Sequence, residues 1–133
     1  MTPEERLLRE SKIIAVVGLS PNPERASYQV ACYLKEKGYT IVPVNPGCAE
    51  ILGGKCYPSL SAVPGPVDVV NIFRASEYAG PIVEEAIGKK ARAVWMQLGV
   101  VNERAAARAS AAGLTVVMDK CMMQEHKKLS LTR

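Results

Sequence analysis

The sequence predicts an α/β fold with one doubly wound sheet of five parallel strands and helices on both faces. Five apolar runs support this prediction, at residues 13–17, 40–44, 67–73, 92–96 and 114–118. The starts of successive runs lie about 22 to 27 residues apart, which is the length of a strand followed by a crossover helix. The first run is continuous and mostly β-branched, as in strands that are buried on both faces. We expect the 133 residues to form a single domain, 1–133.

The segments around the first two runs carry signals for helices and loops. Thr2 stands where a helix N-cap is expected, three residues before Glu5. Residues 26–37 carry an apolar stripe and are followed by a glycine, so the first crossover helix is predicted there. The stretch 45–60 is punctuated by glycine and proline. It predicts a long loop with at most a turn or two of helix near Leu60.

The second half of the chain predicts three more helices. Ser76 and Gly80 each offer a start for the helix that follows the third run. Asn102 is expected to cap an alanine-rich helix over residues 103–112. The tail from Asp119 onward predicts a last short helix that packs against the sheet.

Composition and charge narrow the classes of partner. The net charge is +4, from 17 basic and 13 acidic residues, which suits an anionic small molecule but is small for a nucleic-acid binder. No apolar run approaches the roughly 18 residues of a membrane span, and the N-terminus lacks a signal-peptide core. The four cysteines form no zinc spacing; they are Cys32, Cys48, Cys56 and Cys121. The sequence therefore predicts a cytoplasmic protein with reduced thiols, no metal site, and neither nucleic acid nor membrane as partner.

The candidate ligand site lies just after the apolar runs, because ligands of doubly wound sheets bind at the carboxyl ends of the strands. Gly18 ends the first run and allows a sharp turn or a close approach to a ligand. Ser20, Arg25 and Ser27 follow, just before the first crossover helix begins. A polar loop that leads into a helix N-terminus is a common phosphate site.

Two common nucleotide-binding motifs are absent. A dinucleotide fingerprint needs a second glycine after the first strand and an acidic residue at the end of the second strand. Ser20 stands in place of that glycine, and Asn45 with Pro46 stands in place of the acid. No Gly-Lys-Ser or Gly-Lys-Thr sequence occurs, which excludes a P-loop.

Two arginines remain as candidate phosphate ligands. Arg25 follows the glycine loop and Arg74 follows the third run, and a guanidinium can donate two parallel hydrogen bonds to a phosphate. The alternative for each is a solvated surface arginine. Arg74 has the further alternative of pairing with Glu77. Trp95, inside the fourth run, is expected in the core.

Six sequence blocks together resemble the small stand-alone CoA-binding proteins. The blocks are V-V-G-L-S-P-N-P-E-R-A-S-Y, G-Y-T-I-V-P-V-N-P, Y-P-S-L, V-D-V-V-N-I-F-R, W-M-Q-L-G-V and D-K-C-M-M-Q-E-H. They occur in the family's order and extend over residues 12–129. The fold of that family is Rossmann-like and is similar to the N-terminal domain of the succinyl-CoA synthetase α subunit.

The resemblance implies coenzyme A as the ligand and assigns each strand end a part of it. Gly18, Leu19, Ser20, Arg25 and Ser27 would hold the diphosphate or the 3′-phosphate. The adenosine would be bordered by Val44, Asn45 and Pro46, and the adenine or phosphates would be flanked by Phe73 and Arg74. The path of the pantetheine arm would be lined by Gln97, Leu98 and Gly99.

Catalytic residues are not predicted. The synthetase subunit that the chain resembles has a second domain with a histidine that becomes phosphorylated, whereas this chain ends at Arg133. Its one histidine, His126, lies in a charged tail and is expected on a helix surface. Cys121 is the one candidate nucleophile near the cleft, and an inert buried cysteine is the favoured alternative.

Three functional hypotheses follow. The first is a non-catalytic module that binds CoA or an acyl-CoA as a carrier, sensor or accessory unit. The second is an enzyme, either a subunit of an acyl-CoA-handling enzyme or a nicotinamide-nucleotide-dependent oxidoreductase with a degenerate phosphate loop. The third and weakest is a DNA-binding redox regulator, which would need a helix-turn-helix segment. A homodimer and a partner enzyme subunit are the two expected protein partners.

Overall fold

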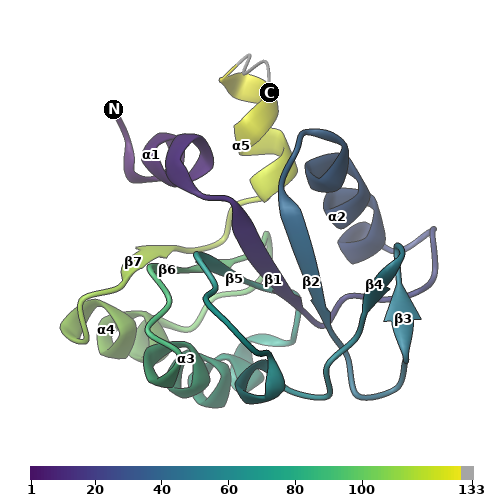
Figure 1. The fold of residues 1–133 in the computed structure, drawn as a ribbon. Coiled ribbons are helices and arrows are strands. Elements are labelled where there is room, and N and C mark those ends of the chain that lie inside the picture. Colours follow the sequence, from purple (N-terminus) through teal and green to yellow (C-terminus); the bar gives the residue numbers. More distant parts are fainter. Residues whose placement is uncertain (130–133) are drawn as a thin grey trace.

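Five parallel strands form the central sheet of the computed structural model, which describes residues 1–129 (Figure 1). The strands lie in the order β2-β1-β5-β6-β7, and every neighbouring pair is parallel. Their bounds are β1 (Ile13–Val17), β2 (Thr40–Val44), β5 (Val69–Ile72), β6 (Ala93–Met96) and β7 (Thr115–Val117). The chain runs outward from β1 to β2 and then crosses back to β5. This confirms the predicted doubly wound topology.

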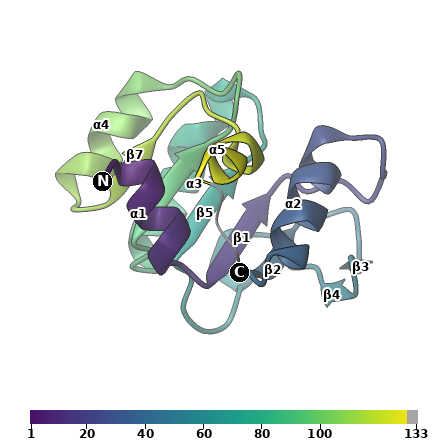
Figure 2. The same ribbon diagram turned by 90° about the horizontal axis from the view of Figure 1, so that it is seen from above.

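Helices cover both faces of the sheet (Figures 1 and 2). One face carries α1 (Pro3–Glu10), α2 (Ala26–Glu36) and α5 (Met122–Lys128), and the other carries α3 (Ala79–Gly88) and α4 (Glu103–Ala111). Short 3₁₀ turns, η1 (Leu60–Ala62) and η2 (Ser76–Tyr78), stand in the loops on either side of β5. Among residues 1–129, no helix is both long enough and apolar enough to cross a membrane.

Successive side chains of the strands serve the two cores alternately. In β1, Ala15 packs toward α3 and α4, whereas Ile14 and Val16 pack toward α1 and α2. Trp95 of β6 is fully buried, as expected, and its Nε1 donates a hydrogen bond to the carbonyl oxygen of Lys120 at 2.8 Å. Full burial of an aliphatic side chain such as Ile14 or Val16 contributes roughly 1.5–3 kcal/mol to the stability of the fold. Because both faces of these strands are buried, their sequences are continuous apolar runs.

The predicted helix caps are present. Thr2 Oγ1 accepts a hydrogen bond from Glu5 N at 3.1 Å, and Asn102 Oδ1 accepts one from Ala105 N at 2.9 Å. The two alternatives for the third crossover are both used, because η2 begins at Ser76 and α3 begins three residues later.

The loop predicted over residues 45–60 was wrong in one part. It contains an antiparallel hairpin, β3 (Glu50–Ile51) and β4 (Gly54–Lys55), that was not predicted. The helical turn predicted near Leu60 is present as η1. The two turn residues, Leu52 and Gly53, have φ angles of 53° and 75°, as a two-residue hairpin turn requires. Leucine is an unusual residue for this backbone region, so the turn lacks the Asn-Gly or Asp-Gly pair that is typical of such a hairpin.

The surface position predicted for His126 was also wrong. Its side chain is only 1% exposed, and its Nδ1 lies 2.7 Å from the hydroxyl oxygen of Tyr33. The imidazole also packs edge-on against the rings of Tyr33 and Tyr39. Burial raises the pKa of the Tyr33 hydroxyl. His126 therefore joins α5 to α2, because α5 lies across the sheet next to that helix.

Gly18 brings three strand ends together at the edge of the sheet. Its backbone φ is +90°, and its N–H donates a hydrogen bond to the carbonyl oxygen of Val44 at 2.9 Å. A Cβ atom at this position would lie 2.7 Å from the carbonyl oxygen of Phe73 and 3.0 Å from Cδ of Arg74. Only glycine allows the loops after β1 and β5 to approach so closely.

We predict that Gly18→Ala destabilises the protein by roughly 2–4 kcal/mol, because it adds a clash with backbone atoms to an unfavourable φ. Gly113→Ala is the matched control, since Gly113 has a φ of +91° but open space within 4 Å of its missing Cβ. The control should lose only about 1 kcal/mol. Urea unfolding measures both values. Equal losses in the two variants would contradict the close contact at Gly18.

A second prediction concerns the ion pair between Glu4 Oε1 and Lys120 Nζ, which are 3.1 Å apart. Burial raises the pKa of Glu4, but hydrogen bonds to its backbone and to Lys120 outweigh that effect and lower the pKa below 4.5. The carboxylate therefore stabilises the fold above about pH 4.5 and loses this effect as the pH falls through the lowered pKa.

Glu4→Gln should accordingly unfold at a lower temperature than the parent at pH 7, by an amount equivalent to about 1 kcal/mol or less. The difference between the two proteins should shrink below about pH 4.5. Glu10→Gln removes a more exposed pair with Arg92 and serves as control, with a smaller effect at pH 7. Thermal melts across this pH range provide the measurement, and a constant difference would speak against the role of Glu4.

Candidate functional site

The loop after β1 is shaped by its own polar side chains. Ser20 Oγ accepts a hydrogen bond from Asn22 N at 3.0 Å, and Asn22 Oδ1 accepts one from Glu24 N at 3.0 Å. Ser27 Oγ accepts a hydrogen bond from Ser20 N at 3.0 Å. Ser27 therefore holds the loop against α2 through its oxygen, while its hydroxyl hydrogen remains available to a ligand.

A first hollow of about 420 Å³ opens between this loop and the start of α2. It is lined by Gly18, Ser20, Arg25, Ala26, Ser27 and Phe73. Arg25 is the N-cap residue of α2, and no side chain caps this helix end. The N–H groups of the first turn, the positive end of the helix dipole and an exposed guanidinium thus face one space, which suits an anion.

A second hollow of about 370 Å³ adjoins the first at Gly18, which lines both. Its walls come from the ends of β1, β2 and β5, from the segment before η1, and from α3. The lining residues are Val17, Gly18, Val44, Asn45, Pro46, Pro58, Ser59, Leu60, Arg74, Ile82 and Glu85. The walls combine apolar side chains with nearly as much polar surface, to which Asn45, Ser59, Arg74 and Glu85 contribute. Apolar surface with polar groups that can fix an orientation suits a small-molecule ligand.

Asn45 joins the loops that bound the second hollow. Its Nδ2 donates a hydrogen bond to the carbonyl oxygen of Leu19 at 2.8 Å, and its Oδ1 accepts one from Gly47 N at 2.7 Å. The backbone of Tyr57 bonds to Pro43 and Asn45 at 3.0 and 2.9 Å. These bonds bring the residues that follow the β3-β4 hairpin to the edge of the site.

Arg74 belongs to the loop that follows β5 and lines the second hollow. Its guanidinium carbon is 4.7 Å from the centre of the Tyr78 ring, an arrangement of cation and aromatic face that is attractive. Over residues 1–129, neither Arg25 nor Arg74 forms an ion pair, so the alternative of an Arg74–Glu77 pair is not observed. Both cations therefore remain available to an anionic ligand.

The structure brings nine of the thirteen residues predicted for the site together around the two hollows, and four lie elsewhere. Leu19 is completely buried and lines neither hollow, and its carbonyl oxygen accepts the hydrogen bond from Asn45 Nδ2. Gln97 is buried, and its Oε1 accepts a hydrogen bond from Met122 N at 3.3 Å. Leu98 is exposed, and Gly99 N donates to Asp119 Oδ1 at 2.7 Å. These last three lie on the neighbouring strand end, after β6.

The sequence missed the residues that the second hollow receives from outside the strand ends. Pro58, Ser59 and Leu60 reach it through the β3-β4 hairpin, and Ile82 and Glu85 reach it from α3. The carboxylate of Glu85 also accepts hydrogen bonds from the N–H and the hydroxyl of Ser61, both at 2.9 Å. A signal existed for Pro58, Ser59 and Leu60, because they form most of the block Y-P-S-L that resembles the CoA-binding proteins. None existed for Ile82 and Glu85.

The cysteines and the acidic groups offer little further chemistry. Burial raises the pKa of the Cys56 thiol, and nearby Cys48 and Glu50 raise it further, so this thiol stays protonated. Cys121 is a half-buried free thiol at the start of α5. The part of the chain that the structure describes contains no group of three or more His, Cys, Asp or Glu side chains that could hold a metal ion.

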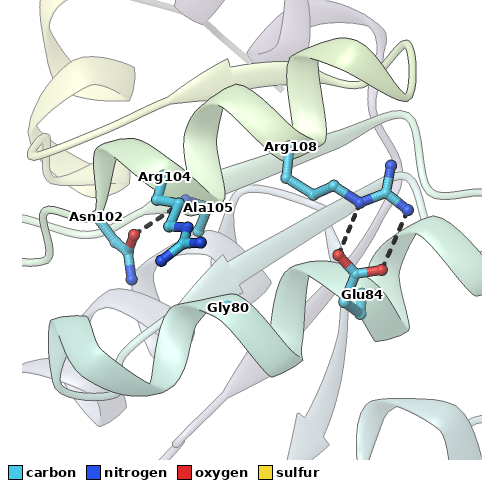
Figure 3. A pocket seen from close by; sticks show the side chains of 6 residues that line it. All are labelled: Gly80, Glu84, Asn102, Arg104, Ala105 and Arg108. Carbon is cyan, nitrogen blue, oxygen red and sulfur yellow. Dashed lines mark hydrogen bonds and ion pairs between the residues drawn. The ribbon is translucent and has the colours of Figure 1, made fainter.

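A third hollow, of about 320 Å³, lies between α3 and α4 (Figure 3). Arg108 of α4 donates to both carboxylate oxygens of Glu84 of α3, at 2.8 and 3.2 Å. Both side chains are about half exposed, so the pair contributes about 1 kcal/mol or less. Arg104 also lines this groove and is not part of that pair. The groove lacks the uncapped helix N-terminus that the hollow at α2 offers to an anion, because the side chain of Asn102 caps α4.

Comparison with known proteins identifies close relatives of similar length. An uncharacterized protein, YneT, from Bacillus subtilis (strain 168) is 43% identical over 122 residues, which are 92% of this chain and 90% of that protein. The solved structure of a hypothetical protein from Pyrococcus horikoshii OT3 superposes with a TM-score of 0.93 at 42% identity. That match covers 98% of this chain and 94% of the other.

The chain is also similar to a small part of a much larger enzyme. ADP-forming acetate–CoA ligase I from Archaeoglobus fulgidus is 35% identical over 79 residues, which are 59% of this chain but only 11% of the ligase. The family described as CoA binding domain matches residues 12–127. Since that match takes in all five strands and the whole loop between β1 and α2, the chain belongs to the CoA-binding domain family.

Proposed function

We propose that the protein binds coenzyme A, or an acyl-CoA, in the two hollows that meet at Gly18. The observation that carries this proposal is the pairing of an uncapped helix N-terminus with Arg25 in one hollow and mixed apolar and polar walls in the adjoining one. Coenzyme A combines the same two chemistries, since it joins phosphate groups to an adenosine. Family membership supports the choice of this ligand. Residues 1–133 would act as one binding domain.

Each hollow suits one part of the ligand. The N–H groups at the start of α2, together with Arg25 and the Ser27 hydroxyl, are donors for the diphosphate or the 3′-phosphate. Val44, Pro46 and Ile82 offer apolar contacts for the adenine. Arg74 lies between the two regions and can reach either a phosphate or the face of the base. The pantetheine arm would then extend toward Gln97, Leu98 and Gly99.

The site suits coenzyme A better than a nicotinamide dinucleotide. Asn45 replaces the acid that would bind a ribose hydroxyl, and both ends of its amide already bond to the backbone. Its role is to join two loops. We therefore favour CoA over the oxidoreductase alternative.

We further propose a non-catalytic role, as a carrier, sensor or accessory module. The histidine is buried against Tyr33 and Tyr39, which makes it a poor candidate for group transfer. The similarity to part of an acetate–CoA ligase favours one second candidate, a subunit of an acyl-CoA-handling enzyme. Co-purification of a stable partner chain with such an activity from the native host would favour this second candidate.

Calorimetric titration with CoA, dephospho-CoA, NAD⁺ and ATP tests the proposal. We expect saturable binding of CoA that Arg25→Ala weakens by about tenfold or more, because a hydrogen bond to a charged group contributes roughly 1.5–3 kcal/mol. Arg92→Ala, at the opposite edge of the sheet, is the matched control and should leave CoA binding unchanged.

The same titrations assign Arg25 to one phosphate. If Arg25 binds the 3′-phosphate, its removal should weaken CoA but not dephospho-CoA; if it binds the diphosphate, both should weaken equally. The proposal would have to be abandoned if CoA showed no saturation at millimolar concentration, or if NAD⁺ or ATP bound tightly and CoA did not.

A further inference from the structure

Three exposed apolar side chains gather on two neighbouring loops at the edge of the sheet. Among residues 1–129, only four large hydrophobic side chains are exposed, and one of these belongs to the terminal Met1. The other three are Tyr78 (50% exposed), Leu98 (68%) and Val101 (43%). We call these three residues the rim patch. Single exposed apolar residues are ordinary, but three together indicate a surface that is covered in use.

The rim patch is held in place by hydrogen bonds between its two loops. Val101 N donates to Ser76 Oγ at 2.9 Å, and Asn102 Nδ2 donates to the carbonyl oxygen of Ser76 at 2.9 Å. Gly99 is in turn bonded to Asp119 at 2.7 Å. The patch is therefore preorganised. A ligand that covers it would lose little free energy to ordering these loops.

The rim patch is continuous with the proposed CoA site. Arg74 lines the second hollow, its Cδ lies close to Gly18, and its guanidinium rests over the ring of Tyr78. Leu98 follows β6, which is the next strand beyond β5 in the sheet. A ligand that fills the hollows at β2, β1 and β5 and continues along the edge of the sheet therefore reaches the patch next.

The groove between α3 and α4 begins beside the rim patch. Gly80 and Asn102 line that groove and stand two residues after Tyr78 and one residue after Val101. Figure 3 shows the Arg108–Glu84 pair farther along the same groove. An apolar chain that leaves the patch thus has a bounded hollow ahead of it.

We propose that the ligand is an acyl-CoA thioester whose acyl chain covers the rim patch and enters the α3–α4 groove. This inference rests on the proposed binding of CoA at Gly18 and Arg25. The pantetheine arm of free CoA would reach the patch only at Leu98 and would leave Tyr78 and Val101 exposed. An acyl chain beyond the thioester buries its own CH₂ groups against these two side chains as well. The patch would then select ligands by chain length.

Titration with CoA and with acetyl-, butanoyl-, hexanoyl- and octanoyl-CoA tests this inference. Each fully buried CH₂ group strengthens binding by up to about fourfold. We therefore expect octanoyl-CoA to bind at least about tenfold tighter than acetyl-CoA, even with partial burial. Val101→Ser and Leu98→Ser should flatten this dependence on chain length. Ala111→Ser, an exposed substitution at the far end of α4, should preserve it.

The outcomes separate this inference from the function on which it rests. If CoA and all thioesters fail to bind, both are overturned. If CoA binds but affinity does not rise with chain length, the inference fails and the proposed function stands. Sedimentation provides a further outcome. Three results together would show that the patch is a contact between two copies of the chain and would overturn the inference: the protein self-associates, Val101→Ser abolishes this association, and affinity does not depend on acyl-chain length.

Discussion

The contact between Gly18 and the backbone at Phe73 is the constraint on which the rest of the site depends. It brings the end of β1 against the loop after β5, while the hydrogen bond from Gly18 to Val44 joins β1 to β2. Both hollows share Gly18 as a wall. Because the chain reverses direction across the sheet at this point, the absence of one Cβ atom allows three strand ends to form one surface.

Most polar side chains around this surface shape loops. Ser20, Asn22, Ser27 and Asn45 all accept hydrogen bonds from backbone N–H groups within residues 20–47. The groups left for an anion are then the N–H groups at the start of α2, the Ser27 hydroxyl hydrogen and the guanidinium groups of Arg25 and Arg74. Under the proposed function, such a site would hold a phosphate partly through backbone geometry and would need neither a P-loop lysine nor a fingerprint of three glycines.

Two side chains of chemically reactive types, His126 and Cys56, lie outside the two hollows. His126 contributes to the packing of α5 on α2, and burial keeps Cys56 protonated. A stretch of 79 residues of this chain is also similar to a small part of the Archaeoglobus fulgidus ligase.

The sequence by itself determined the strands, the helix caps and most of the strand-end residues of the site. These features depend on local chemistry, namely continuous apolar runs, the side chains of Thr2 and Asn102, and a glycine followed by a polar loop. The tertiary structure alone decided the β3-β4 hairpin, the burial of His126, the contribution of α3 to the second hollow, and the exposure of the rim patch. Contacts between residues far apart in the chain hold each of them in place. Tyr57 with Pro43 joins the segment after the hairpin to β2, His126 with Tyr33 joins α5 to α2, Glu85 with Ser61 joins α3 to η1, and Val101 with Ser76 joins the two loops of the rim patch. No local pattern encodes such pairs, since each residue type is compatible with several environments until the fold supplies its neighbour.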